Sequence, residues 1–155
     1  MSLVVDASVA LKWFLSEEPL ASQALAVVQD GGTLLAPDFL IAEVCNAAWR
    51  SARLGRISQA QVGEIAAGLP RFFDALVTAA ELAARAVAIA GQLDHPVYDC
   101  LYLALAEAEQ VGLVTADLRL LDKVRKTAWE AWAINLSEYR SVCVRPAYGQ
   151  DTSGP

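Results

Sequence analysis

The feature that most constrains the fold is the regular alternation of short apolar runs with longer segments of helical periodicity. The runs at residues 3–5, 33–36 and 113–115 are aliphatic or β-branched, which is typical of buried strands, and weaker strand signals lie at residues 74–77 and 131–136. Strands that alternate with helices form right-handed βαβ units and a parallel sheet covered by helices on both faces. The chain is therefore predicted to be an α/β protein.

The segments between these runs carry helix-end signals as well as helical periodicity. Pro19 and Pro96 stand where helices commonly begin, Ser8 and Asp38 are candidate N-caps, and Gly55 is a candidate helix end. These signals predict helices over residues 9–15, 19–29, 38–54, 58–73, 79–92, 96–110 and 118–126. At least one helix therefore separates each strand candidate from the next, as parallel pairing requires.

Length and composition indicate one globular domain. A chain of 155 residues is long enough for a full core, and 55% hydrophobic residues exclude intrinsic disorder. The longest run without a charged residue has 11 positions, too few for the about 20 residues of a membrane span, and the first residues lack a secretory pattern. We expect a cytoplasmic protein with one domain over residues 1–144 and a flexible C-terminal tail over residues 145–155.

Cysteine, histidine and glycine usage excludes several kinds of site. Cys45, Cys100 and Cys143 are too far apart for a Cys-x-x-Cys motif, and their apolar neighbours favour a role in the core. His95 is the single histidine, which excludes His-rich metal sites and disfavours a Ser-His-Asp triad. The chain has no glycine-rich phosphate-binding motif. Carboxylates are therefore its main chemical resource.

Four acidic residues occupy positions that are unusual for solvated carboxylates. Asp6 and Asp117 follow strand runs, so both are expected at the carboxyl edge of the sheet, where ligands bind. Glu43 and Asp99 lie in mostly apolar helices, and a buried carboxylate costs several kcal/mol unless it is neutralised. Each also has a local explanation. Asp117 could be an N-cap, Asp6 a turn residue, Glu43 a partner of Arg50 or Lys12, and Asp99 a helix-start acid.

Carboxylates that converged at one edge of the sheet would require a cation. Without one, repulsion would force at least one of them to bind a proton. Mg²⁺ and Mn²⁺ prefer oxygen ligands, lower the pKa of a water and polarise phosphoryl oxygens, which suits phosphodiester hydrolysis. The net charge of −6 has an unusual sign for a nucleic-acid binder, and a bound cation would partly neutralise it.

Four sequence blocks resemble those of the PIN-domain nucleases. The blocks are Val4-Val5-Asp6-Ala7-Ser8, Glu43-Val44 with Asn46 and Arg50, Tyr98-Asp99-Cys100-Leu101-Tyr102-Leu103-Ala104, and Thr115-Ala116-Asp117-Leu118-Arg119-Leu120. Their acids follow one another at intervals of 37, 56 and 18 residues, and the match spans residues 3–136. The short single-domain form is similar to the VapC-like toxins of bacterial and archaeal toxin–antitoxin pairs.

The resemblance implies a PIN-like three-layer α/β/α sandwich with a central parallel sheet. It also implies an endoribonuclease that depends on Mg²⁺ or Mn²⁺ and hydrolyses RNA by a metal-activated water. The residues that would be catalytic and bind the metal are Asp6, Glu43, Asp99 and Asp117. The residues that would contact substrate or support the acids are Ser8, Asn46, Arg50, Thr115, Arg119 and Lys123.

The partners that the resemblance implies are an RNA substrate, a cognate antitoxin protein and a second copy of the chain, with no membrane. Trp13, Phe72 and Phe73 are candidates for an exposed dimer face, although packing within one chain would explain them equally well.

Three other functions are alternatives to a nuclease. A receiver-like domain needs paired acids after the first strand, but Ala7 follows Asp6. A haloacid-dehalogenase-like phosphatase needs Asp-x-Asp, but position 8 is a serine. A non-catalytic metal- or RNA-binding regulatory module with the same fold would share every acid, so turnover of RNA is what distinguishes it.

Overall fold

The computed structural model describes residues 1–140, so the predicted tail at residues 145–155 and Cys143 lie outside the described residues. The strands are β1 (Ser2–Val5), β2 (Thr33–Pro37), β3 (Ala75–Val77), β4 (Gly112–Thr115) and β5 (Ala133–Asn135). The α-helices are α1 (Ala7–Ala10), α2 (Ala21–Gln29), α3 (Phe39–Arg53), α4 (Gln59–Gly68), α5 (Ala79–Leu93), α6 (Val97–Glu109) and α7 (Leu118–Val124). Short 3-10 helices are η1 (Leu11–Trp13), η2 (Leu69–Phe72), η3 (Ala128–Ala131) and η4 (Leu136–Glu138).

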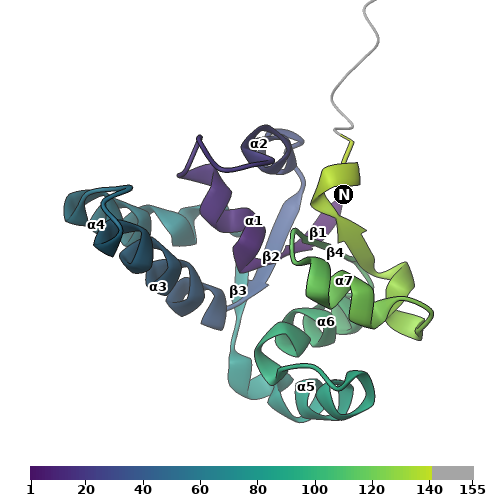
Figure 1. The fold of residues 1–155 in the computed structure, drawn as a ribbon. Coiled ribbons are helices and arrows are strands. Elements are labelled where there is room, and N and C mark those ends of the chain that lie inside the picture. Colours follow the sequence, from purple (N-terminus) through teal and green to yellow (C-terminus); the bar gives the residue numbers. More distant parts are fainter. Residues whose placement is uncertain (141–155) are drawn as a thin grey trace, which may run out of the picture.

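The strands form one parallel sheet in the order β3-β2-β1-β4-β5. The chain moves in one direction along the sheet up to β3 and in the other from β4, so right-handed crossovers put α1–α4 on one face and α5–α7 on the other. Figure 1 shows these two helical layers with the sheet between them. The predicted α/β/α sandwich is confirmed. The reversal of direction between β1 and β4 makes a switch point, where open α/β sheets bind ligands.

Most helix bounds follow the predicted signals, and the differences have local causes. Gly55 adopts a left-handed φ of 71° directly after Leu54, the C-cap of α3, as predicted for a helix-end glycine. The helix predicted from Pro19 begins two residues later, because Leu20 is left-handed with a φ of 65°. The helix predicted over residues 58–73 is divided into α4 and η2, with Pro70 near the start of η2.

Asp38 was predicted to cap α3 and instead supports α5. It stands at the N-cap position of α3, but its side chain makes no capping hydrogen bond there. Its carboxylate accepts hydrogen bonds from Thr78 Oγ1 at 3.2 Å and from the backbone N–H of Ala79 at 2.9 Å. The start of α5 lies close to Asp38 because β2 and β3 are neighbours in the sheet.

The apolar core extends over both faces of the sheet. Helix α6 packs against β1, β2, β4 and α5, and its residues 100–106 are all buried. Burial, together with Asp99, raises the pKa of Cys100 to about 11, which keeps this thiol neutral and agrees with a core role. Cys45 is half-buried on α3. Within residues 1–140, no helix combines the length and apolar character needed to cross a membrane.

Trp13 packs against both Phe72 and Phe73. The ring centroid of Trp13 lies 5.1 Å from that of Phe72 and 5.6 Å from that of Phe73. The indole N–H of Trp13 donates to the backbone oxygen of Ala24 at 2.9 Å. All three aromatic residues are partly buried, so they serve packing within one chain and give no support to the predicted dimer face.

Candidate metal centre at the carboxyl edge of the sheet

Asp6 lies at the end of β1, beside the switch point. The residue is only 7% exposed, and its Oδ2 accepts hydrogen bonds from Ser8 Oγ at 2.5 Å and Thr115 Oγ1 at 2.6 Å. Burial raises the pKa of Asp6, the two hydrogen bonds lower it, and the charges of Asp99 and Asp117 raise it further. Asp6 is therefore a buried, oriented carboxylate that lies within electrostatic reach of two other acids.

Ser8 and Thr115 connect the ends of β1 and β4. The prediction of Ser8 as an N-cap is wrong, because α1 begins before it, with Asp6 at the N-cap position. Ser8 Oγ accepts the backbone N–H of Ala116 at 3.0 Å, and Thr115 Oγ1 accepts that of Asp117 at 3.0 Å. Each hydroxyl therefore donates to Asp6 and accepts from the loop that carries Asp117, which fixes both acids relative to the sheet.

Asp99, Asp117 and His95 converge in front of these strand ends. Asp99 lies in the first turn of α6, Asp117 is the N-cap of α7, and His95 lies between α5 and α6. Each offers one ligand atom, and these atoms all lie within 4.8 Å of one another. Asp117 Oδ1 accepts the backbone N–H groups of Arg119 and Leu120 at 2.8 and 3.3 Å, which leaves Oδ2 outside these bonds. The local explanation of Asp117 as an N-cap is correct, and the residue also faces Asp99.

The carboxylate of Asp99 is 24% exposed, and its Oδ2 lies 2.7 Å from His95 Nε2. Burial raises the pKa of Asp99, the neighbouring His95 lowers it, and the charge of Asp117 raises it. An acid that only compensates the helix dipole would be solvated and would have no acidic neighbours. Asp99 is partly buried and has Asp117 as an acidic neighbour, so the helix dipole alone does not explain it.

Glu43 is half-buried on α3, and its Oε2 accepts a hydrogen bond from the hydroxyl of Tyr102 on α6. The pKa of Glu43 is raised to about 7. Burial is the largest cause, the hydrogen bond from Tyr102 acts in the opposite direction, and the charges of Asp6 and Asp99 raise the pKa further. The alternative pairing with Arg50 or Lys12 is wrong for the described residues, since Glu43 pairs with Tyr102. We call the four carboxylates, together with His95, the acidic centre.

The other predicted residues lie around the acidic centre in different settings. Glu43, Asn46 and Arg50 line one cavity of about 220 Å³ between α1 and α3, as expected of a polar stripe at helical spacing. Arg119 is exposed at the start of α7. Lys123 has a partner within the chain: its Nζ donates to the backbone oxygen of Asp94 at 2.8 Å and lies 3.3 Å from Asp94 Oδ2.

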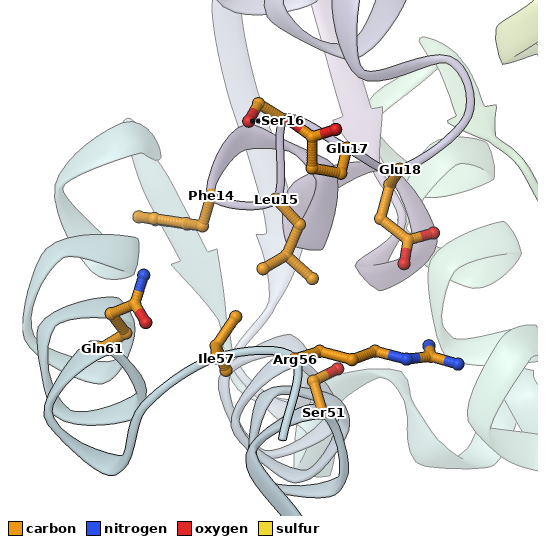
Figure 2. A pocket seen from close by; sticks show the side chains of 9 residues that line it. All are labelled: Phe14, Leu15, Ser16, Glu17, Glu18, Ser51, Arg56, Ile57 and Gln61. Atoms are coloured by element: carbon orange, nitrogen blue, oxygen red, sulfur yellow. Dashed lines mark hydrogen bonds between the residues drawn. The ribbon is translucent and has the colours of Figure 1, made fainter. Parts of the chain in front are cut away.

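A larger cavity, of about 520 Å³, contains none of the predicted acids. Figure 2 shows this cavity between the loop after η1 and two helices. The loop contributes Leu15 and Glu18, the C-terminal end of α3 contributes Ser51, and the N-terminal end of α4 contributes Gln61. Cavity size therefore does not identify the acidic centre, which is marked by its chemistry.

His95 was not among the predicted site residues. A single histidine excludes a histidine-rich site but is compatible with a mixed site of carboxylates and one imidazole. The available signal was spacing, because His95 precedes Asp99 by four residues at the start of α6.

The fold and the acidic centre agree with a family match. The PIN domain model matches residues 3–126, and the chain belongs to the PIN domain family. It is 35% identical over 125 residues to Ribonuclease VapC3 from Pyrobaculum aerophilum, covering 79% of this chain and 95% of that protein. The crystal structure of PAE2754 from Pyrobaculum aerophilum has a similar fold, with a TM-score of 0.64 and 24% identity over 88% of this chain and 85% of the other. The predicted similarity to VapC-like PIN nucleases is confirmed.

Proposed function

We propose that the protein is an endoribonuclease that hydrolyses RNA with a divalent metal ion held in the acidic centre. The observation that carries this proposal is that Asp99 and Asp117, with His95, converge within electrostatic reach of the buried Asp6 at the switch point of a PIN-family sheet. The name of the relative, Ribonuclease VapC3, supports RNA as the substrate. Asp6, Asp99 and Asp117 would hold the ion, with Glu43 beside them.

The donor set fits a divalent cation. The pKa values of Asp6, Glu43 and Asp99 are all raised, chiefly by burial and also by neighbouring acids, and a cation would relieve both effects. Carboxylate oxygens suit Mg²⁺ and Mn²⁺. When bound, such an ion supplies Lewis-acid chemistry, which activates water and stabilises the charge that develops on a phosphoryl group.

The chain's own residues orient the reacting groups. Ser8 and Thr115 hold the Asp6 carboxylate in one direction, and the hydroxyl of Tyr102 holds Glu43 through Oε2. Because these contacts exist before substrate arrives, the acids need little rearrangement when RNA binds.

Two features beside the acidic centre suit single-stranded RNA. Arg50 lies in the cavity that Glu43 also lines, and Arg119 is exposed next to Asp117, so both can contact phosphates on either side of the cleaved bond. Tyr98 is 60% exposed next to Asp99 and stacks on Phe39 with the ring centroids 5.1 Å apart. An exposed ring face of this kind can stack on an unpaired base.

The test is cleavage of single-stranded RNA by the purified chain with Mg²⁺ or Mn²⁺, followed by sequencing of the RNA ends. The parent and a Glu64→Gln control, altered at an exposed position on α4, should cut the RNA, and Asp99→Asn should not. If the parent binds the ion but cuts no RNA, the non-catalytic regulatory module is the better description. If Asp99→Asn cuts as fast as the parent, the assignment of the site is wrong.

We also propose a toxin role in the cytoplasm, with a cognate antitoxin and a homodimeric state, as the similarity to a VapC protein suggests. An antitoxin encoded by a neighbouring open reading frame should block RNA cleavage when the two proteins are mixed. Sedimentation at micromolar concentration should give the mass of two chains, and the mass of one chain would refute the dimer.

A further inference from the structure

We propose that His95 is a nitrogen ligand of the metal ion and that it makes the acidic centre prefer Mn²⁺ to Mg²⁺. This inference rests on the proposed function, because it requires an ion in the acidic centre. It adds a donor that the four carboxylates do not provide.

The imidazole of His95 is buried against the acids. Its side chain is only 7% exposed, and its Nε2 lies 2.7 Å from Asp99 Oδ2, at ion-pair distance. Apart from Asp99, this nitrogen has no polar partner within the described residues, and a cation held by Asp99 and Asp117 would meet it as the next donor. Neighbouring ligands of an octahedral ion at about 2.1 Å lie about 3 Å apart, which is close to the separation of Nε2 and Asp99 Oδ2. The nitrogen therefore has the position of a ligand.

The backbone around His95 holds the ring in this place. Asp94 adopts a left-handed φ of 49° at the end of α5, and the N–H of His95 donates to the backbone oxygen of Ala90 at 3.3 Å. Pro96 follows, which restricts the backbone of the residue before it. Lys123 binds the backbone oxygen of Asp94 and so joins this turn to α7, which Asp117 caps.

A nitrogen ligand changes which ion the acidic centre prefers. Imidazole is a good ligand for first-row transition metals, whereas Mg²⁺ prefers oxygen and keeps most of its waters. A centre made of carboxylates alone would bind Mg²⁺ and Mn²⁺ by the same kind of contact. With His95 as a ligand, Mn²⁺ gains a contact that Mg²⁺ uses poorly.

Pulsed electron paramagnetic resonance of bound Mn²⁺ tests this ligand directly. The chain has one histidine, so labelling with ¹⁵N-histidine in protein without an affinity tag marks His95 alone. We expect a nitrogen coupling that changes from ¹⁴N to ¹⁵N on labelling, disappears in His95→Gln, and persists in the exposed control Gln92→Ala. Bound Mn²⁺ without this coupling would overturn the inference and leave the proposed function intact.

Calorimetric titrations of both ions separate a ligand from a residue that only positions Asp99. Loss of even a residue that only supports a metal ligand weakens metal binding by about tenfold or more. The substitution His95→Gln should therefore weaken the binding of Mn²⁺ by at least that factor, and the binding of Mg²⁺ by clearly less. Equal losses for the two ions would show that His95 only holds Asp99, which contradicts the inference. If the parent binds neither ion, both the inference about His95 and the metal centre of the proposed function are wrong.

Discussion

Replacing Glu43 by Gln should stabilise the metal-free protein at neutral and alkaline pH. Glutamine keeps an oxygen that can accept the Tyr102 hydroxyl, so the change removes the charge and little else. The raised pKa of Glu43 means that the fold disfavours the ionised form, which is present at pH 8 in the parent. The substitution therefore removes a destabilising interaction.

The magnitude follows from the two pKa values. The pKa of Glu43 is about 7 in the folded chain against an ordinary value of 4.5, and at about 1.4 kcal/mol for each pKa unit a fully buried group would lose about 3 kcal/mol. Glu43 is partly exposed, so solvent screening reduces this to about 1–2 kcal/mol. For a domain of this size we expect the Tm to rise by about 2–8 °C.

The free energy of unfolding of the parent should fall relative to that of Glu43→Gln as the pH rises. Because the folded pKa is raised, the unfolded chain loses its proton first, and the penalty in the parent grows from pH about 4.5 and is complete above pH about 7. Thermal unfolding in EDTA should therefore show Glu43→Gln above the parent at pH 8 and equal to it at pH 4. The exposed Glu64→Gln serves as the matched control. A parent that is more stable than Glu43→Gln at pH 8, or a difference that does not vary with pH, would refute the reasoning.

Three further predictions concern the ion, the substrate and the hydroxyl beside Asp6. Mn²⁺ or Mg²⁺ should raise the Tm of the parent in thermal unfolding, because the ion binds the folded chain and not the unfolded one. Asp99→Asn should lose most of this rise in Tm. If the rise in Asp99→Asn equals that of the parent, the ion is bound elsewhere. Tyr98→Ala should raise KM for single-stranded RNA with little change in kcat, because a stacking contact of about 1–3 kcal/mol is made before and during the reaction, and initial-rate measurements check this. Thr115→Val should lower the free energy of unfolding, measured in urea titrations, by about 1–3 kcal/mol. The reason is that the fully buried side chain of Thr115 hydrogen-bonds to Asp6 and to the backbone N–H of Asp117, and valine makes neither bond. An unchanged free energy of unfolding would mean that water replaces the hydroxyl.

Local sequence pattern was sufficient for the central part of the fold. The aliphatic runs that became β1, β2 and β4 lie within one residue or so of their predicted bounds, because buried parallel strands are short and continuously apolar. The same pattern was enough to select Asp6 and Asp117, since a residue that follows a parallel strand has its edge of the sheet determined by chain direction. Asp99 and Glu43 were selected because a carboxylate is costly in an apolar helix.

Contacts between distant segments depend on how the elements pack, and the local hydrophobic periodicity of the sequence does not predict them. Asp38 supports the start of α5 because β2 and β3 pair, and the ring of Trp13 contacts those of Phe72 and Phe73 from a distant part of the chain. His95 combines both kinds of contact. Its distance of four residues from Asp99 is a local signal, but its approach to Asp117 depends on how the turn between α5 and α6 packs next to α7, which the spacing does not determine.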